Sequence, residues 1–178
     1  MSKAVLISIR PEWTRLILNG EKTIEVRKTR PKLGTPFKCY IYQTLPKSGD
    51  WNDRDGHVIG EFVCDEIKTI DIPYPAYWTE RHKRELDGSC LTLQQAHSYL
   101  GSSCGYGWHI SELKVYDEPK KLREFTPCCK YMLDEKQCDY QKILCPLQQD
   151  SFFAEDGCNC MNFVKRPPQS FCYVEELS

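Results

Sequence analysis

The sequence predicts an α+β fold, a mixed and mostly antiparallel β-barrel with a few short helices. Segments rich in β-branched and aromatic residues outnumber the helical segments. Several of these segments follow one another with no helix between them, which is typical of antiparallel pairing, because parallel neighbours need a long crossover. The chain has 178 residues, enough for one self-sufficient core with an appendage. We therefore favour the barrel over a doubly wound parallel sheet.

The individual elements follow from local patterns. Strands are expected near residues 4–9, 23–30, 37–44, 58–67 and 107–116. A helix over 11–19 starts at Pro11, whose missing N–H costs nothing in a first turn, and ends before Gly20, which suits the left-handed position after a helix. Shorter helices are expected at 79–86 and from a capping box at Thr92 to Gly101, with a helical turn at 120–125.

Charge and hydropathy narrow the function classes. The formal net charge is −1, which argues against binding to a long duplex but leaves room for a local cationic pocket. Residues 1–9 form a short apolar run without a basic leader or a cleavage site. No apolar stretch approaches the ~20 residues that a membrane span needs. We expect a cytoplasmic protein with no membrane partner.

The cysteines divide the chain into three parts. Seven of the eleven cysteines crowd the last third, and a reducing compartment favours free thiols or metal thiolates over disulfides. We expect a barrel over 1–125, a Cys-rich appendage over 126–165 and a closing or edge strand within 166–178. A structural zinc ion is a candidate cofactor of the appendage, although no Cys-x-x-Cys pair occurs; buried thiols packed as small apolar groups are the alternative. The candidate zinc ligands are Cys129, Cys138, Cys145 and Cys158.

A polar cluster follows the first predicted helix. Glu25 and Arg27 share one face of the strand near 23–30, because strand side chains alternate, and Lys22 sits at the junction of helix and strand. Arg10 opens the helix at its other end. One interpretation is a solvated ladder of ion pairs, which alternating charge on a strand usually indicates. The other is a pocket in which Arg and Lys hold phosphate or polar base edges and Glu accepts from a base N–H.

The residues 8–13 and 17–28 resemble the N-terminal signature of ASCH domains, and 40–42, 58–62 and 107–110 resemble later strands of that pattern. The resemblance spans roughly residues 4–118 and implies a PUA-like barrel with RNA or a modified nucleoside as ligand. One branch of the family, similar to acetylcytidine amidohydrolases, carries Gly-x-Lys-Thr-x-Thr-x-Arg. Here Lys22 and Thr23 match, but Glu25 stands where the second Thr would be. Residues 166–174 also resemble the tail of phage-encoded ASCH-like proteins.

These observations give three functional hypotheses. The first is an RNA or modified-nucleoside binding module in which Arg10, Lys22, Glu25 and Arg27 hold the ligand and Tyr42 or Trp108 stacks on it. The second is a small hydrolase acting on RNA or an acylated nucleoside, with Lys22 and Glu25 as the acid–base pair. The third is an interaction protein that docks a partner through the Cys-rich appendage. We expect Trp13 to pack its helix onto the core. The pattern leaves the oligomeric state open.

Overall fold

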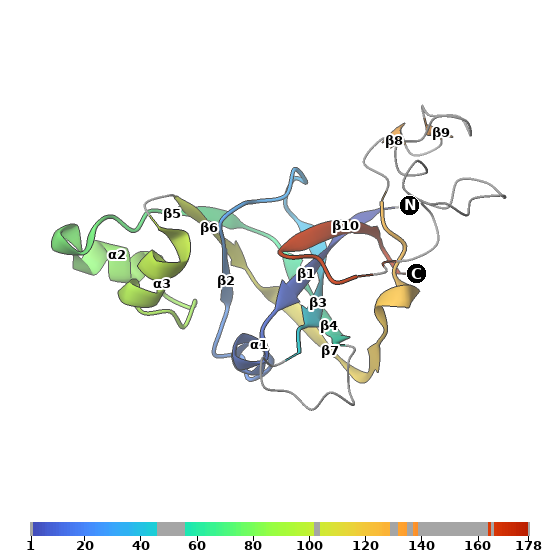
Figure 1. Cartoon of the computed structure of the whole chain (residues 1–178), viewed down its shortest axis with the longest axis horizontal. Helices are drawn as coiled ribbons and strands as arrows, with labels where there is room; N and C mark the ends of the chain where they lie inside the picture. Colours follow the sequence, from blue (N-terminus) through green and yellow to red (C-terminus); the bar gives the residue numbers. More distant parts are fainter. Residues whose placement is uncertain are drawn as a thin grey trace.

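The structure is a computed structural model that describes residues 2–45, 56–101, 104–128, 132–134, 137–138, 164 and 166–177. Strands dominate the described part and helices are short, which confirms the mixed α+β class (Figure 1). The elements are, in chain order, β1 (Lys3–Ile9), α1 (Pro11–Leu18), β2 (Ile24–Arg27), β3 (Phe37–Gln43), β4 (His57–Cys64), β5 (Ile67–Ile70), η1 (Pro75–Tyr77), α2 (Glu80–Glu85), α3 (Leu93–Leu100), β6 (Gly105–His109), β7 (Ser111–Lys120), η2 (Leu122–Glu124), β8 (Met132–Asp134), β9 (Gln137–Cys138) and β10 (Phe171–Glu175).

The strands form two main sheets. The larger has the order β10-β1-β3-β4-β7 and the smaller the order β2-β6-β5, while β8 and β9 pair only with each other. The β1–β3 pair is parallel and its crossover contains α1 and β2; every other pair among the described strands is antiparallel. Strand β10 pairs with β1 from Lys3↔Glu175 to Ile7↔Phe171, so the C-terminal segment does return to the sheet.

The ladders of the described strands end at the sheet edges and do not join into a closed barrel. Two segments expected as single strands divide between the sheets. The first becomes β4 and β5, which separate at 65–66, and the second becomes β6 and β7, which separate at Ile110. At this corner Asp65 Oδ1 lies 2.6 Å from His109 Nδ1. The chain thus bends between two packed sheets where a continuous strand was expected.

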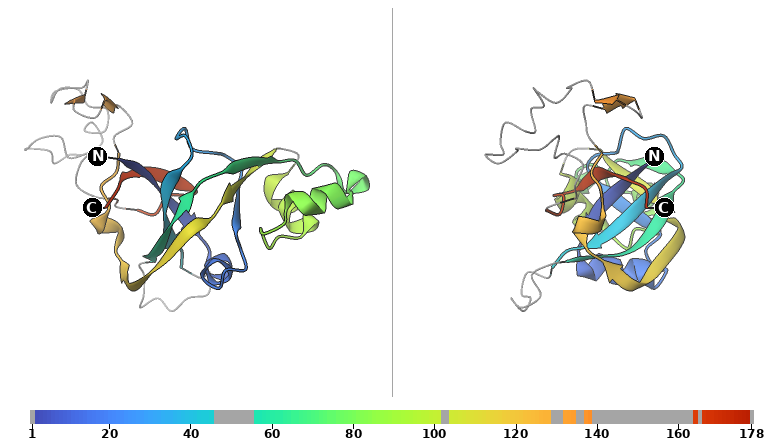
Figure 2. Two further views of the ribbon diagram at one scale, coloured as in Figure 1. Left: turned by 180° about the vertical axis from the view of Figure 1, so that it is seen from behind. Right: turned by 90° about the vertical axis from the view of Figure 1, so that its right-hand side faces the viewer.

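Three hydrophobic clusters hold the layers together. Strand β1 supplies two of them, because Val5 and Ile7 point into one cluster while Leu6 points into another on the opposite face of the larger sheet. This double burial explains why β1 reads as an unbroken apolar run. The third cluster lies under α2 and α3, which form a lobe beyond the smaller sheet (Figure 2). Within the described part of the chain, no helix has the length and apolar character needed to cross a membrane.

Strand β2 lies between the lobe and the larger sheet. Its apolar residues Ile24 and Val26 belong to the cluster under the helices. Glu25 pairs in register with Trp108 of the cluster between the sheets, and Arg27 donates to the backbone of Ser8 in β1. The predicted alternation is therefore present, but the polar face of β2 is turned toward the other sheet.

Candidate functional site

The end of α1 delivers Lys22 to the site. Gly20 has φ +75°, in the left-handed region expected for it, and its N–H donates to the carbonyl of Ile17 at 2.9 Å. The N–H groups of Glu21 and Lys22 both donate to the carbonyl of Leu16, at 2.9 and 3.0 Å. The bonds from Gly20 to Ile17 and from Glu21 to Leu16 together form the Schellman motif, which satisfies the last carbonyls of a helix and reverses the chain. Lys22 consequently lies two residues before β2, and its ammonium reaches the carbonyl of Ile24 at the start of that strand.

The loop between α2 and α3 forms the opposite wall. The Gly88 carbonyl accepts from the N–H groups of Thr23 and Ile24, at 2.7 and 2.9 Å. Gly88 has φ +78°, and a Cβ there would lie 2.3 Å from Thr23 Oγ1, so the close approach requires glycine. The next carbonyl, that of Ser89, accepts from Lys22 Nζ. Sequence reasoning missed this loop, because no local pattern links it to β2.

The ammonium of Lys22 is buried and saturated. Lys22 is 2% exposed, and its Nζ donates to the carbonyls of Ser89 at 2.7 Å and Ile24 at 2.8 Å. The same atom lies 3.4 Å from Glu25 Oε2 and 5.3 Å from the centre of the Trp13 ring. Burial lowers the pKa of Lys22, and the Glu25 carboxylate opposes that shift. All three N–H donors of the ammonium therefore face an acceptor.

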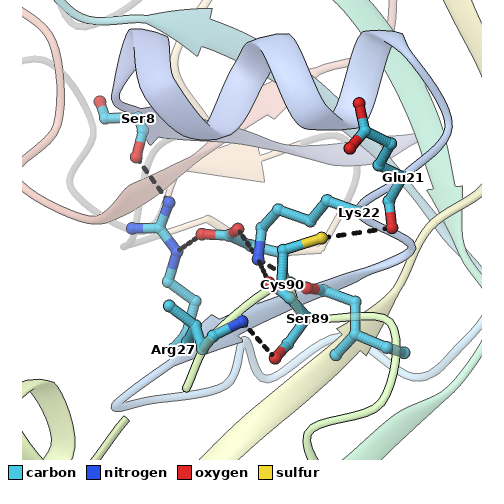
Figure 3. A network of polar contacts seen from close by, with 9 residues as sticks. Ser8, Glu21, Lys22, Arg27, Ser89 and Cys90 are labelled. Atoms are coloured by element: carbon cyan, nitrogen blue, oxygen red, sulfur yellow. Dashed lines mark hydrogen bonds and ion pairs between the residues drawn. The ribbon is translucent and has the colours of Figure 1, made fainter. Parts of the chain in front are cut away.

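Glu25 joins Lys22 to Arg27. Glu25 Oε1 lies 3.0 Å from Arg27 Nε, and the side chains are 9% and 8% exposed. Arg27 Nη2 donates to the Ser8 carbonyl (Figure 3), whereas the buried Nε has no hydrogen-bond partner among the described residues. The short Nε–Oε1 distance is a charge contact without hydrogen-bond alignment. The solvated ladder is thus not what the chain forms, because the charged face of β2 lies against the larger sheet.

A cavity of about 560 Å³ opens onto this ion cluster. Its lining includes four of the predicted ligand-binding residues, Arg10, Lys22, Glu25 and Arg27. Three cations and one carboxylate give these four a formal net charge of +2. A larger cavity of about 710 Å³ lies beside α2 and α3, but its described lining contains a single cation, Lys83, and none of the predicted residues. The charge of its lining therefore distinguishes the cavity at the cluster from this larger one.

The two aromatic residues expected to stack on a ligand lie elsewhere, which corrects the expectation for Tyr42 and Trp108. Trp108 is fully buried between the sheets, edge-on to Phe37 and Phe171 at centroid distances of 5.9 and 5.3 Å. Tyr42 is 4% exposed and packs in the cluster on the opposite face of the larger sheet. Both side chains fill space that the packing of the sheets requires, which is the usual role of strand aromatics.

Among the residues that the structure describes, the aromatic ones lining the cavity are Trp13 and Tyr99. Trp13 packs partly against the core, as expected, but its ring also faces Lys22. Its place inside the motif at 8–13 was a usable signal. Tyr99, on α3, is 40% exposed, and no sequence pattern connects α3 with β2. The cavity therefore combines residues from α1, β2 and the helical lobe.

The expected zinc site lies beyond what the structure describes. Cys129, Cys145 and Cys158 fall outside the described residues, and Cys138 is placed only as part of β9. Across the described ranges, no group of three or more His, Cys, Asp or Glu side chains could hold a metal ion. Zinc binding by the appendage stays a prediction.

Solved structures of the ASCH protein from Zymomonas mobilis are similar to this chain. The unmodified protein aligns with a TM-score of 0.56 and 21% identity, covering 97% of this chain and 88% of that one. A tyrosine-to-phenylalanine variant gives 0.57 and 20% over 98% and 92%. A serine-to-alanine variant gives 0.56 and 20% over 97% and 89%. No protein-family model and no curated protein matches the sequence. At this identity the likeness shows the fold, and the chain has the fold of an ASCH domain protein.

Proposed function

We propose that this chain is an ASCH-type module that binds RNA or a modified nucleoside in the cavity beside Lys22, Glu25 and Arg27. The observation that carries the proposal is a buried ion cluster that lines a cavity and leaves one buried donor, Arg27 Nε, without a hydrogen-bond partner among the described residues. Buried polar atoms are nearly always paired, so an unpaired one beside a cavity calls for a partner such as an ion, a water or a ligand.

Each residue has a role suited to a nucleotide. Arg27 and Arg10 supply donors for phosphate or for polar base edges, and a guanidinium can bind such groups through two parallel hydrogen bonds. Glu25 accepts from a base N–H. Trp13 and Tyr99 supply the aromatic walls on which a base stacks, a contact worth ~1–3 kcal/mol. The combination of apolar walls with a few convergent polar groups is what small-ligand sites have in common.

The proposal includes a cytoplasmic location. Six cysteines in the described part of the chain are free thiols: Cys39, Cys64, Cys90, Cys104, Cys128 and Cys172. Free thiols persist where the compartment is reducing.

The test uses residues whose replacement spares the buried cluster. Arg10 lines the cavity with its side chain 64% exposed, so Arg10→Ala should fold normally. Loss of its charged hydrogen bonds should weaken binding of a nucleoside monophosphate about tenfold, measured by titration calorimetry. Arg15→Ala, an exposed arginine of α1 that does not line the cavity, is the matched control. If Arg10→Ala and Arg15→Ala both bind like the unmodified protein, the cavity is not the site.

A hydrolase is the second candidate, because Lys22 and Glu25 are adjacent and burial lowers the pKa of Lys22. The saturated ammonium weighs against it, since general acid–base work needs a donor or lone pair that can reach the substrate. Glu25→Gln separates the two functions. A binder still binds its ligand, because the amide oxygen still accepts a hydrogen bond. A hydrolase acting on RNA or an acylated nucleoside loses turnover while it still binds.

A further inference from the structure

A second cationic feature begins where β2 ends. Residues 27–38 contain five Lys or Arg side chains and no Asp or Glu, in a chain whose net charge is −1. Three of these cations, Lys28, Arg30 and Lys32, are exposed and occupy alternate positions. We call these three residues the basic strip. In Figure 1 the segment continues from the end of β2 that lies away from α1.

The cations of the basic strip have no carboxylate partner in the part of the chain that the structure describes. Among the described residues, no Asp or Glu oxygen lies within 4.0 Å of Lys28, Arg30 or Lys32. Two exposed cations of α2 behave differently, since Arg81 pairs with Glu85 and Lys83 with Glu80. The strip therefore presents an uncompensated positive charge, which attracts a polyanion over a distance set by ionic strength.

Aromatic rings hold two of these cations in place. Lys28 Nζ lies 5.3 Å from the centre of the Tyr99 ring, and Arg30 Cζ lies 5.8 Å from the centre of the Tyr106 ring. The backbone N–H of Lys32 donates to the Tyr173 hydroxyl at 2.7 Å, which fixes the segment itself. Cations held in this way lose less side-chain freedom when a phosphate binds them.

The basic strip is continuous with the cavity. Arg27 lines the cavity and immediately precedes the strip. Tyr99 also lines the cavity, and its ring contacts the ammonium of Lys28. An extended backbone from 28 to 32 reaches at most ~13 Å, so the three cations fall along a short path that starts at the cavity mouth. A single nucleoside in the cavity cannot occupy this path as well.

We propose that the basic strip is a phosphate track for a single-stranded nucleic acid, one nucleotide of which occupies the cavity. This proposal rests on the proposed function and names its ligand as a strand rather than a free nucleoside. Phosphates on the strip carry no sequence information, so the strip sets the position of the strand while the cavity reads one base. Three cations are too few for a duplex, which needs a broad basic face.

Salt dependence tests the track directly. Each phosphate contact with a single strand contributes about −0.7 to the slope of log K against log salt concentration, so three contacts contribute about −2. Lys28→Ala, Arg30→Ala and Lys32→Ala should each reduce the magnitude of that slope by about 0.7 for an unstructured RNA of about eight nucleotides, measured by fluorescence anisotropy. None of them should change the affinity for a nucleoside without phosphate. Lys114→Ala, an exposed cation of β7 with no carboxylate partner among the described residues, is the control.

The outcomes separate the two proposals. If the strip variants keep the original slope and affinity while Arg10→Ala weakens binding, the track is refuted and the cavity stands. If the strip variants lower the slope while Arg10→Ala has no effect, the strip binds phosphate, but the proposal that the cavity binds a nucleotide is refuted. For a DNA strand of the same sequence, each strip variant should reduce the salt slope by the same amount as for RNA, because the strip contacts only phosphate. A reduction found with only one of the two nucleic acids refutes the track.

Discussion

Replacing Glu25 by glutamine is the sharpest test of the buried ion cluster. The carboxylate is 9% exposed and lies between Lys22 Nζ at 3.4 Å and Arg27 Nε at 3.0 Å. Glutamine keeps the shape but leaves two buried cations with no anion between them. Removing one partner of a buried ion pair costs ~3–5 kcal/mol. Because the cavity lets water reach the cluster, we expect a loss near ~3 kcal/mol in the free energy of unfolding.

Urea unfolding, followed by tryptophan fluorescence at neutral pH, measures this loss. The matched control is Glu12→Gln, whose ion pair with Arg10 spans 3.9 Å between side chains that are 55% and 64% exposed. An exposed pair contributes only ~0–1 kcal/mol, so this variant should unfold almost like the original protein. A Glu25→Gln protein that loses less than ~1 kcal/mol would refute the reasoning, because the cluster would then be solvated in solution.

The same variant connects stability with ligand binding. Without the Glu25 charge, the cavity gains one formal positive charge relative to the original protein. A nucleoside monophosphate should therefore raise the unfolding midpoint of Glu25→Gln by more than it raises that of the original protein. Equal shifts in the two proteins would mean that the phosphate does not bind near the cluster.

Three further predictions concern other parts of the chain. Burial raises the pKa of Cys64 from 9.0 to about 12 and that of Cys172 to about 11, so both stay protonated in the folded chain while the unfolded chain ionises. The stability that the two protonated thiols contribute below about pH 9 should thus be lost as the pH rises toward 12. In Cys64→Ala the melting temperature should fall less steeply with increasing pH than in the original protein. Gly88→Ala should destabilise the chain more than Gly101→Ala in urea unfolding; both have φ above +70°, but only at Gly88 does the added Cβ meet another residue, Thr23. Equal losses would show that the close contact costs nothing. Elemental analysis of the reduced protein should find about one equivalent of zinc, and its absence would rule out the proposed ligands Cys129, Cys138, Cys145 and Cys158.

The features that the sequence predicts correctly are local ones. The left-handed turn at Gly20, the capping box at Thr92 and the alternation of β2 each depend on residues within one or two turns of each other. Thr92 accepts from the Gln95 N–H at 3.2 Å, as the capping pattern requires. Such features are readable because backbone geometry relates the residues directly.

The features that the sequence does not reveal depend on contacts between distant segments. The carbonyl that holds Lys22 belongs to Ser89, 67 positions later in the chain. The breaks that divide β4 from β5 and β6 from β7 carry no glycine or proline at the corner; Ile110 sits there instead. Burial of Trp108 in preference to exposure at the cavity likewise depends on how the two sheets pack. Sequence periodicity indicates which residues share a face of a strand or helix, but it does not indicate which part of the fold packs against that face.

The contacts of the two buried cations assign them different roles. Lys22 has three donors, and all three face acceptors inside the protein, two carbonyls and Glu25. Arg27 has five donors, of which one is bonded to Ser8 and one, Nε, is buried without a hydrogen-bond partner among the described residues. Of these two cations, Arg27 therefore retains unfilled hydrogen-bonding capacity and Lys22 does not. Lys22 holds Glu25 and the Ser89 loop in place, and we propose Arg27 as the residue of the cluster that meets the ligand.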